Sequence, residues 1–301
     1  AVLHEWGVAS AEGWVFSRLL EDGDIVVVER DRSLLRVDRD SAVLWSVPVR
    51  AHHDFDVWND TIVALTREQE RREDISPAAQ TNLDFVSLYS LDGTLRSKIS
   101  LLDALRASEF AYLLPSVRDL YFDDHAPERH KTLCPTHANH VEVIDAAETW
   151  MGKPAGRALL LISLRNINTI LVMDLETHEV VWAWGPNVLT YQHHPSLLST
   201  GNVLVFNNGL DRSSVLEIDP RTFDIAWRYS EPGFFSVTRG SAQRLPNGNT
   251  LITESNEGRV FEVTAGGDIV WEWKNPDVSE DGMRSAVFRM AALNEYPAWL
   301  Q

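Results

Sequence analysis

The chain has 301 residues, and 44% of them are hydrophobic, which is enough to bury the core of one large β domain or of two smaller domains. Its 27 basic and 44 acidic residues leave a net charge of −17. This acidic balance argues against a nucleic-acid or anionic-lipid surface, because both need clustered Lys and Arg side chains. An anionic substrate would have to be attracted by a local cationic pocket and not by the overall field.

The cysteine content and the apolar runs limit which disulfides and membrane spans the chain can form, and the start of the chain bears on a targeting segment. Cys134 is the only cysteine, so an intrachain disulfide is excluded. No run of about 18 apolar residues is present that could span a membrane. The chain starts at Ala1 without Met and without a signal peptide, which leaves open that an upstream targeting or anchor segment was removed.

An internal repeat is the main signal in the sequence. Trp182, Trp227 and Trp271 are 45 and 44 residues apart, and each lies in a short β-type run. The runs of this kind are SAVLWSV (41–47), HEVVWAW (178–184), FDIAWRY (223–229) and GDIVWEW (267–273). An apolar strand that ends in a turn precedes each of these runs by about nine residues.

A further set of apolar strands lies ahead of these, at 24–29, 60–66, 157–164, 202–208 and 249–255. The turn sequences PNGN (246–249) and TGN (200–202) precede two of them, which is typical of antiparallel hairpins. Three or four strands that recur about every 45 residues predict propeller blades. A β-sandwich would not produce this self-similarity.

Five blade units follow from the repeat, at 13–49, 52–99, 136–184, 192–230 and 239–276. The start, AVLHEW, matches an outer strand, and SAVFRMAAL (285–293) resembles an inner one, so the two ends could share a sixth, incomplete blade that leaves no exposed edge. We therefore predict an all-β fold in a single domain over residues 1–301. It is a six-bladed β-propeller with four-stranded antiparallel blades, one of them incomplete, plus a short helical insertion.

Two stretches interrupt the repeat. Residues 67–84 are polar and predict an exposed loop. Residues 100–135 include LLDALRASEFAYLL, whose apolar spacing predicts a short helix. Long insertions between propeller strands often cover the ligand mouth. Since this insertion leads into a histidine-rich segment, we expect it to lie near the channel mouth and to shape the choice of ligand.

Six of the ten histidines fall in three similar places. They are His52 and His53 in AHHDFDV, His137 and His140 in THANHVEV, and His193 and His194 in YQHHPSLL. Each pair lies a few residues before the first turn of its blade, and equivalent positions of different blades converge at one mouth of a propeller. The pattern therefore favours a site, although a single histidine there could equally be a polar residue that hydrogen-bonds a loop.

Two arginines lie near the same positions. Arg239 takes the place of the histidines in the last unit, in TRGSAQRLPNGN, and Arg165 follows an apolar strand in LISLRNINTI. A buried or channel-facing guanidinium needs a carboxylate or an oxyanion as its partner. These positions therefore indicate a cationic pocket for an anion.

Several of these motifs resemble those of the PAPS-independent arylsulfotransferase family. HANHVEVID, SLRNINTILVMD and YQHHPSLLSTGNVLVFNNG resemble its histidine, arginine and histidine motifs, and AHHDFDVWNDTIVAL resembles an earlier His-His-Asp motif. The likeness covers most of the chain, while 67–135 match poorly. The chain departs from the pattern at NNG (207–209), where DNG is expected, at His194, and in an insertion at 146–157.

The resemblance implies a ping-pong transfer of a sulfuryl group from a phenolic sulfate ester to a phenolic acceptor through a sulfohistidine. By motif, His193 matches the histidine that carries the group, and His137, His53 and Arg165 match its supporting catalytic residues. We expect the substrate to be bound further by His52, His194, Asn139, Arg239 and Tyr191. No metal, no cofactor and no nucleic acid is expected. The resemblance also implies export to the periplasm or the outside of the cell, with a removed N-terminal anchor as the one membrane link; the oligomeric state stays open.

Other readings of the same residues stay open. Cys134, His137 and His140 have the spacing of zinc ligands, with Asp123, Asp124, His125 and His130 upstream, but strand alternation puts the two histidines of that set on opposite faces. A non-catalytic propeller could bind a small molecule, a glycan or a protein at the same mouth. Quinone-dependent dehydrogenases with tryptophan-rich blades usually need a longer chain, and a Ser-His-Asp hydrolase lacks its G-x-S-x-G sequence here.

Overall fold

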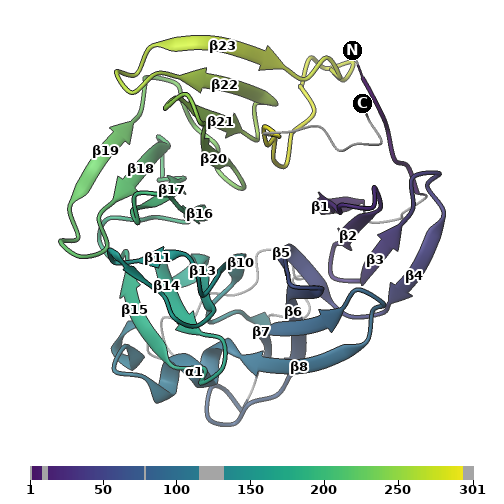
Figure 1. Ribbon diagram of the computed structural model, residues 1–301, viewed down its shortest axis with the longest axis vertical. Coiled ribbons are helices and arrows are strands. Elements are labelled where there is room, and N and C mark those ends of the chain that lie inside the picture. Colours follow the sequence, from purple (N-terminus) through teal and green to yellow (C-terminus); the bar gives the residue numbers. More distant parts are fainter. Residues whose placement is uncertain (1, 9–12, 78, 115–131, 294–301) are drawn as a thin grey trace. The chain divides into compact units, whose positions relative to one another are not determined.

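The computed structural model describes residues 2–8, 13–77, 79–114 and 132–293. The fold is an all-β propeller with five blades, each a four-stranded antiparallel sheet whose strands follow one another in chain order (Figure 1). The chain divides into two compact units, one with the first two blades and one with the other three. The prediction of β blades is confirmed, and the unit boundaries of the repeat agree with the observed sheets.

The first unit holds two blades. The first blade consists of β1 (Trp14–Leu19), β2 (Ile25–Glu29), β3 (Ser33–Val37) and β4 (Val43–Val47). The second blade consists of β5 (Ala51–Trp58), β6 (Thr61–Glu70), β7 (Gln80–Ser90) and β8 (Leu95–Ser100), and the short strand β9 (Thr132–Leu133) pairs with β7 in parallel.

The second unit holds three blades. The third blade consists of β10 (Ala138–Ile144), β13 (Leu159–Leu164), β14 (Thr169–Asp174) and β15 (Val180–Trp184), with the hairpin β11 (Thr149–Trp150) and β12 (Lys153–Pro154) between its first two strands. The fourth consists of β16 (His193–Leu197), β17 (Val203–Asn207), β18 (Ser214–Ile218) and β19 (Ile225–Tyr229). The fifth consists of β20 (Ser241–Arg244), β21 (Thr250–Glu254), β22 (Arg259–Val263) and β23 (Ile269–Lys274).

Burial along the strands explains their composition. The middle strands β2, β13 and β14 are buried at every residue, which is why they read as continuous apolar runs instead of alternating ones. The fourth strands β4, β19 and β23 are mostly exposed. The core therefore lies between neighbouring sheets, as the clusters around Val172 and Val205 and around Phe206 and Phe261 show.

The repeated tryptophans link neighbouring blades of a unit. The indole N–H of Trp45 donates to the Leu91 carbonyl at 2.9 Å, in the last turn of the next blade. Trp182 donates to Pro220 at 3.1 Å, and Trp227 donates to Ala265 at 2.9 Å, in the equivalent turns of the next blades. The repeat thus encodes one blade-to-blade hydrogen bond as well as apolar contact area.

The predicted sixth blade is wrong for the residues that the structure describes. Residues 2–8 form no strand, and Trp6 and Val8 pack on the core of the first blade instead. Residues 285–293 also form no strand. They bind the fifth blade largely through side chains, since the Gln243 amide donates to the Ala292 carbonyl at 3.0 Å and accepts from the Ala292 N–H at 2.8 Å. Apolar strand-like sequence at these two ends serves to cover an existing sheet.

The exposed loop predicted at 67–84 is also wrong in part. Strands β6 and β7 continue as a long ladder in which Arg67 is the partner of Asp84 and Glu70 is the partner of Thr81. Arg67, Asp84 and Asn82 are buried. Strands are usually detected by an alternation of apolar and polar residues. Here the paired side chains are charged or polar, so the sequence did not predict that the strands continue through this stretch.

The predicted helix is confirmed as α1 (Leu101–Ala107), followed by a 3-10 turn at Ala111–Leu113. Most of the remaining insertion, residues 115–131, lies outside the described residues, so its position at a channel mouth stays a prediction. Across the described ranges, none of the helices has the length and apolar character that a membrane crossing needs.

Candidate functional site

The motif residues of the second unit lie where the first strands of its blades begin, and their backbone is unusual. His137, Tyr191, His194 and Arg239 have φ angles of 49°, 55°, 47° and 61°. Such left-handed backbone costs of order 1–3 kcal/mol for a residue with a side chain, and it concentrates at functional sites. The same conformation recurs in three successive blades, which indicates that the surrounding structure holds these side chains in defined positions.

The bulges at these points change the direction of the side chains. The register between β10 and β13 shifts between Ala138 and His140, and that between β16 and β17 shifts between His193 and Ser196. A regular strand would send His193 and His194 to opposite faces, and the bulge removes that constraint. The histidine pairs therefore cannot be placed by strand alternation alone.

Gln192 anchors the YQHH motif in the protein interior. Its side chain is fully buried, and the amide Nε2 donates to Ser163 Oγ at 3.0 Å, to the Thr169 carbonyl at 3.0 Å and to the Leu164 carbonyl at 3.2 Å. Asn139, predicted as a substrate ligand, is itself buried and donates from Nδ2 to the Gln192 carbonyl at 2.8 Å. These bonds join the third blade to the fourth directly behind His193.

His193 has a defined set of hydrogen-bond partners. Its Nδ1 lies 2.8 Å from Oδ1 of Asn208 and 2.9 Å from the Tyr191 carbonyl, which are both acceptors. The Asn208 amide is oriented by two donations of its own, from Nδ2 to the carbonyls of Ser236 and Arg239. Nδ1 therefore carries the proton, and Nε2 carries the lone pair, which accepts from the Arg239 N–H at 3.2 Å.

Burial and nearby charge keep His193 neutral. Burial lowers the pKa of His193 to about 4, the positive charges of Arg165 and Arg289 act in the same direction, and the hydrogen bonds that the ring donates to Asn208 and Tyr191 only partly oppose them. The imidazole at pH 7 is consequently neutral, with a fixed tautomer whose lone pair lies on Nε2. That state fits covalent catalysis.

Arg165 begins a 3-10 turn (Arg165–Ile167), and its N–H donates to the His137 carbonyl at 3.1 Å. Its guanidinium carbon lies 4.5 Å from the centre of the Tyr191 ring, a cation–π contact that holds the side chain above the aromatic face. The structure therefore brings His137, Arg165, Tyr191 and His193 together around one point of the second unit.

Arg289 is a residue that the sequence analysis missed. It follows Phe288, whose ring centre lies 5.5 Å from the Arg239 guanidinium carbon. Its segment is fixed to the fifth blade, because the Val287 N–H donates to the Ser255 carbonyl at 3.1 Å and the Met290 N–H donates to Thr253 Oγ1 at 3.1 Å. The available signal was a lone arginine inside the apolar run SAVFRMAAL.

His194 and His140 form a second histidine pair. Their ring centres are 4.8 Å apart in an edge-to-face arrangement. Burial, the charge of Arg289 and the proximity of His140 hold the pKa of His194 well below its usual value. Nε2 of His140 is 3.8 Å from a carboxylate oxygen of Glu142. The His194 ring is thus a polar but uncharged neighbour of His193.

The remaining predicted residues, His52 and His53, belong to β5 in the first unit. His52 is buried and His53 is half-buried, with its φ angle at 59°. Their Nδ1 atoms are 2.8 Å apart. The expectation that they share a site with His193 stays a prediction.

No observation in the described part of the chain supports the zinc interpretation. Within residues 2–8, 13–77, 79–114 and 132–293, no three His, Cys, Asp or Glu side chains form a group that could hold a metal. Cys134 is buried. Asp123, Asp124, His125 and His130 lie outside the described residues.

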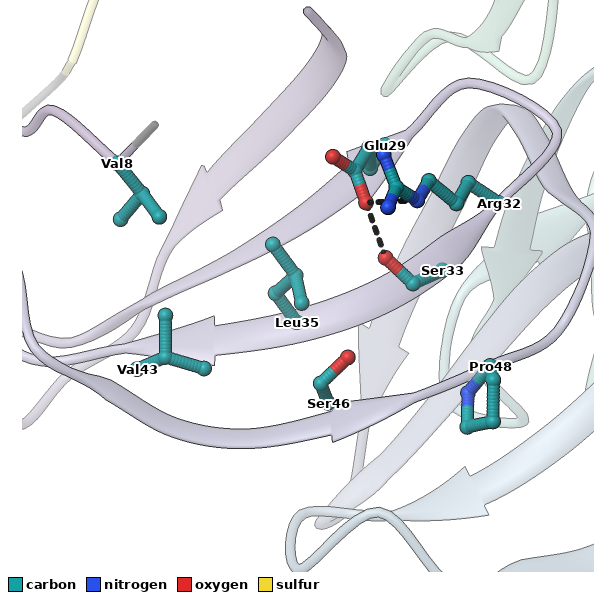
Figure 2. Close-up of a pocket in the computed structure, with 8 residues that line it drawn as sticks. All are labelled: Val8, Glu29, Arg32, Ser33, Leu35, Val43, Ser46 and Pro48. Carbon is teal, nitrogen blue, oxygen red and sulfur yellow. Dashed lines mark hydrogen bonds and ion pairs between the residues drawn. The ribbon is translucent and has the colours of Figure 1, made fainter. Parts of the chain in front are cut away.

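A cavity of about 320 Å³ lies on the first blade (Figure 2). Its lining comprises Val8, Glu29, Arg32, Ser33, Leu35, Val43, Ser46 and Pro48. The Glu29 carboxylate accepts from Ser33 Oγ at 2.6 Å and lies 3.8 Å from Arg32. None of the predicted site residues lines this cavity, so we do not assign the predicted chemistry to it.

Comparison with solved structures finds similar folds at low identity. A protein of unknown function from Bacteroides caccae shares 12% identity, with a TM-score of 0.51, over 89% of this chain and 84% of that one. A catalytically inactive virginiamycin B lyase from Staphylococcus aureus with quinupristin shares 10%, with a TM-score of 0.50, over 89% of this chain and 73% of the lyase. The Dos1 propeller shares 12% identity, with a TM-score of 0.47. That match covers 89% of this chain and 59% of the Dos1 chain. These likenesses concern the fold alone.

The family comparison is more specific. No curated protein matches the chain. The sequence model of the arylsulfotransferase (ASST) family matches residues 18–276, a range that includes the His-His-Asp motif, His137, Arg165, His193 and Arg239. The chain therefore belongs to the arylsulfotransferase family, a family of transferases whose name implies aryl sulfates and phenols as substrates.

Proposed function

We propose that this protein transfers a sulfuryl group from an aryl sulfate ester to a phenol through a sulfohistidine at His193. The observation that carries the proposal is the hydrogen-bonded state of that ring: buried, neutral, with its proton fixed on Nδ1 by Asn208 and its lone pair on Nε2. A neutral imidazole is a good nucleophile at neutral pH when one ring nitrogen holds the proton in a hydrogen bond and the other carries the lone pair.

In the first half-reaction, Nε2 of His193 forms an N–S bond as the S–O bond to the aryl group breaks, and the phenolate leaves with that electron pair. The Arg239 N–H, which Nε2 releases when it attacks, becomes available to a sulfuryl oxygen. Arg165 supplies positive charge to the same oxygens, because its charge already acts on the His193 ring. Such positioning and charge neutralisation is how phosphoryl transfer, the nearest analogue, is catalysed.

In the second half-reaction, an acceptor phenol loses its proton, and its oxygen attacks the sulfur of the sulfohistidine. The N–S bond breaks, and His193 recovers its lone pair. A second histidine must protonate the leaving phenolate and later deprotonate the incoming phenol. The motif residues His137 and His53 are our candidates for the supporting roles, and the substrate contacts are assigned by motif to His52, His194, Asn139, Arg239 and Tyr191.

The family resemblance also supports the proposal that the protein is exported to the periplasm or to the outside of the cell. Fractionation of the native cells would test this location. The donor and acceptor themselves can be sought with a panel of phenols that differ in size and charge.

The test of the chemistry is direct. The protein is incubated with an aryl sulfate, denatured and digested, and the peptide that contains residues 191–197 is searched by mass spectrometry for an added SO₃ group. We expect the adduct on His193 in the wild-type protein and its loss in His193→Ala. His178→Asn, at an exposed turn of the same unit, is the matched control and should keep the adduct. An adduct that persists in His193→Ala moves the role to another histidine, and no adduct with any aryl sulfate supports the non-catalytic binding propeller.

A further inference from the structure

The cavity on the first blade, about 320 Å³ in volume, has a buried carboxylate in its lining. Glu29, the last residue of β2, is only 7% exposed. Its Oε2 accepts from Ser33 Oγ at 2.6 Å, and Nε of Arg32 lies 3.8 Å from the same oxygen. Figure 2 shows these three side chains at one end of the lining, with Val8 and Val43 at the other end. A cavity of this size suits a small molecule.

The strand register identifies the same position in the fifth blade. Glu29 pairs with Ser33 next to the turn that joins β2 to β3. Glu254 pairs with Arg259 next to the turn that joins β21 to β22. Both carboxylates are buried, with exposed fractions of 7% and 2%. The two blades therefore share a buried carboxylate here and differ in the residue opposite it.

In the fifth blade a guanidinium fills the space beside this carboxylate. Nη1 of Arg259 donates to Oε2 of Glu254 at 3.1 Å, and its Nε donates to Oε1 of Glu272 at 2.6 Å. The guanidinium carbon lies 4.1 Å from the centre of the Phe261 ring. Charge-assisted hydrogen bonds and a cation–π contact act together in this arrangement. The fifth blade thus shows which chemistry complements a carboxylate at this position.

The first blade has smaller side chains at each of these places. By register, the corresponding residues are Ser33 for Arg259, Leu35 for Phe261, and Ser46 for Glu272. The carboxylate is kept, while the guanidinium and the ring that fill the space in the fifth blade are replaced by a hydroxyl and an aliphatic side chain. The smaller side chains account for the cavity, and Glu29 gives it one charged end beside apolar walls.

Arg32 is a weaker partner for Glu29 than Arg259 is for Glu254. The Arg32 side chain is 58% exposed, and its Nε lies beyond hydrogen-bonding distance of the carboxylate. Arg259 is 17% exposed and lies within 3.1 Å of three carboxylates. An exposed ion pair is screened by water and contributes little. A cation that enters the cavity can therefore compete with Arg32 for Glu29.

We propose that this cavity binds a small organic cation with a guanidinium group, which Glu29 holds while the apolar body of the molecule lies against Leu35, Val43 and Val8. The net charge of −17 attracts such a cation over longer distances. This inference does not rest on the proposed function, because none of the residues that carry it belongs to the His193 site.

The first test compares two probes that differ in charge and match in shape. Butylguanidinium is the ligand, and the neutral butylurea is its control. Binding of each to the full chain is followed by ligand-detected NMR titration. We expect butylguanidinium to bind at least about tenfold more tightly, because hydrogen bonds between two charged groups are the strong ones. Equal binding of the two probes, or no binding of butylguanidinium, would overturn the proposal.

The second test changes the carboxylate and fills the cavity. Glu29→Gln should weaken butylguanidinium binding at least about tenfold. Glu21→Gln, in an exposed turn of the same blade, removes the same charge and should leave the affinity unchanged. Ser33→Arg places a guanidinium where the fifth blade has Arg259, so it should abolish binding. Binding that persists in both Glu29→Gln and Ser33→Arg would show that the probe binds elsewhere.

The exposed Arg32 gives a test in the opposite direction, in a variant whose fold should not change. Arg32→Gln removes the competing cation, so butylguanidinium should bind about two- to fivefold more tightly. Equal or weaker binding in this variant would mean that the ligand does not replace Arg32 at Glu29, and it would overturn the assignment even if Glu29→Gln failed to fold.

Discussion

Oδ1 of Asn208 lies 2.8 Å from Nδ1 of His193, and the Asn208 amide cannot turn over without losing its two donations to the carbonyls of Ser236 and Arg239. The asparagine thus acts as a fixed acceptor that selects one tautomer of the proposed nucleophile. An aspartate would accept the same proton, but it would bring a buried negative charge and lose both donations.

Asn208→Asp should therefore slow formation of the His193 adduct, by up to about tenfold at pH 6. The carboxylate stabilises the protonated imidazole, so the pKa of His193 rises and the rate should recover as the pH is raised. The measurement is the adduct rate as a function of pH. Asn247→Asp, in an exposed turn, is the control, and a pH profile identical to that of the wild type would contradict the role given to Asn208.

The pH dependence of the wild-type protein follows from the lowered pKa of His193, about 4. Adduct formation with a good leaving group should be constant from pH 7 to about 5.5 and should fall only near pH 4, where the ring is protonated. A rate that already halves near pH 6.5, as for an ordinary imidazole, would show that the ring is not buried and neutral as described.

The same shift links stability to pH. Between pH 6.5 and about 4 the unfolded chain binds a proton at His193 that the folded chain does not, so folding becomes less favourable as the pH falls through this window. Above pH 6.5 both states are neutral and the group contributes nothing. The cost reaches about 3 kcal/mol at pH 4. Urea unfolding should show His193→Gln losing less stability than the wild type between pH 7 and pH 4.5.

Arg289→Met tests the arginine that the sequence did not reveal. Removal of a positive charge near His193 should weaken the binding of the aryl sulfate about tenfold, and it should raise the pKa of His193 because one of the charges that lower it is gone. The dissociation constant and the pH profile are measured together. Arg228→Met on the exposed β19 is the control, and an effect on neither quantity would place Arg289 outside the site.

The repeated tryptophans allow a test of stability inside one protein. Trp182→Phe removes the donor to the Pro220 carbonyl and leaves a buried cavity, which should cost about 1–3 kcal/mol of unfolding free energy. Trp271→Phe, at the equivalent place in the last blade, should cost little, because Trp271 is 44% exposed. Equal losses in the two variants, measured by denaturant unfolding, would refute the blade-to-blade role of this hydrogen bond.

Much of the fold could be predicted because its signals are local. Apolar runs such as the one at 249–255 and the turn PNGN (246–249) specify a hairpin by themselves, and the tryptophan spacing repeats it. The ends were misassigned because an apolar segment such as 285–293 has the same composition whether it pairs as a strand or covers a sheet. The ladder between Arg67 and Asp84 was missed because its pairing is between polar side chains.

The sequence by itself determined the blade positions and the residues that carry the family motifs, since both depend on short stretches of chain. Only the tertiary structure decided the tautomer of His193 and which distant groups lie beside the histidine rings. Asn208 lies 15 residues from His193, and Asp84 lies 32 residues from His52. No local sequence pattern could therefore predict that the members of each pair are close in space. Bulges and left-handed φ angles at His53 and His194 set the ring directions, and these are adopted only when the neighbouring strands hold the backbone there.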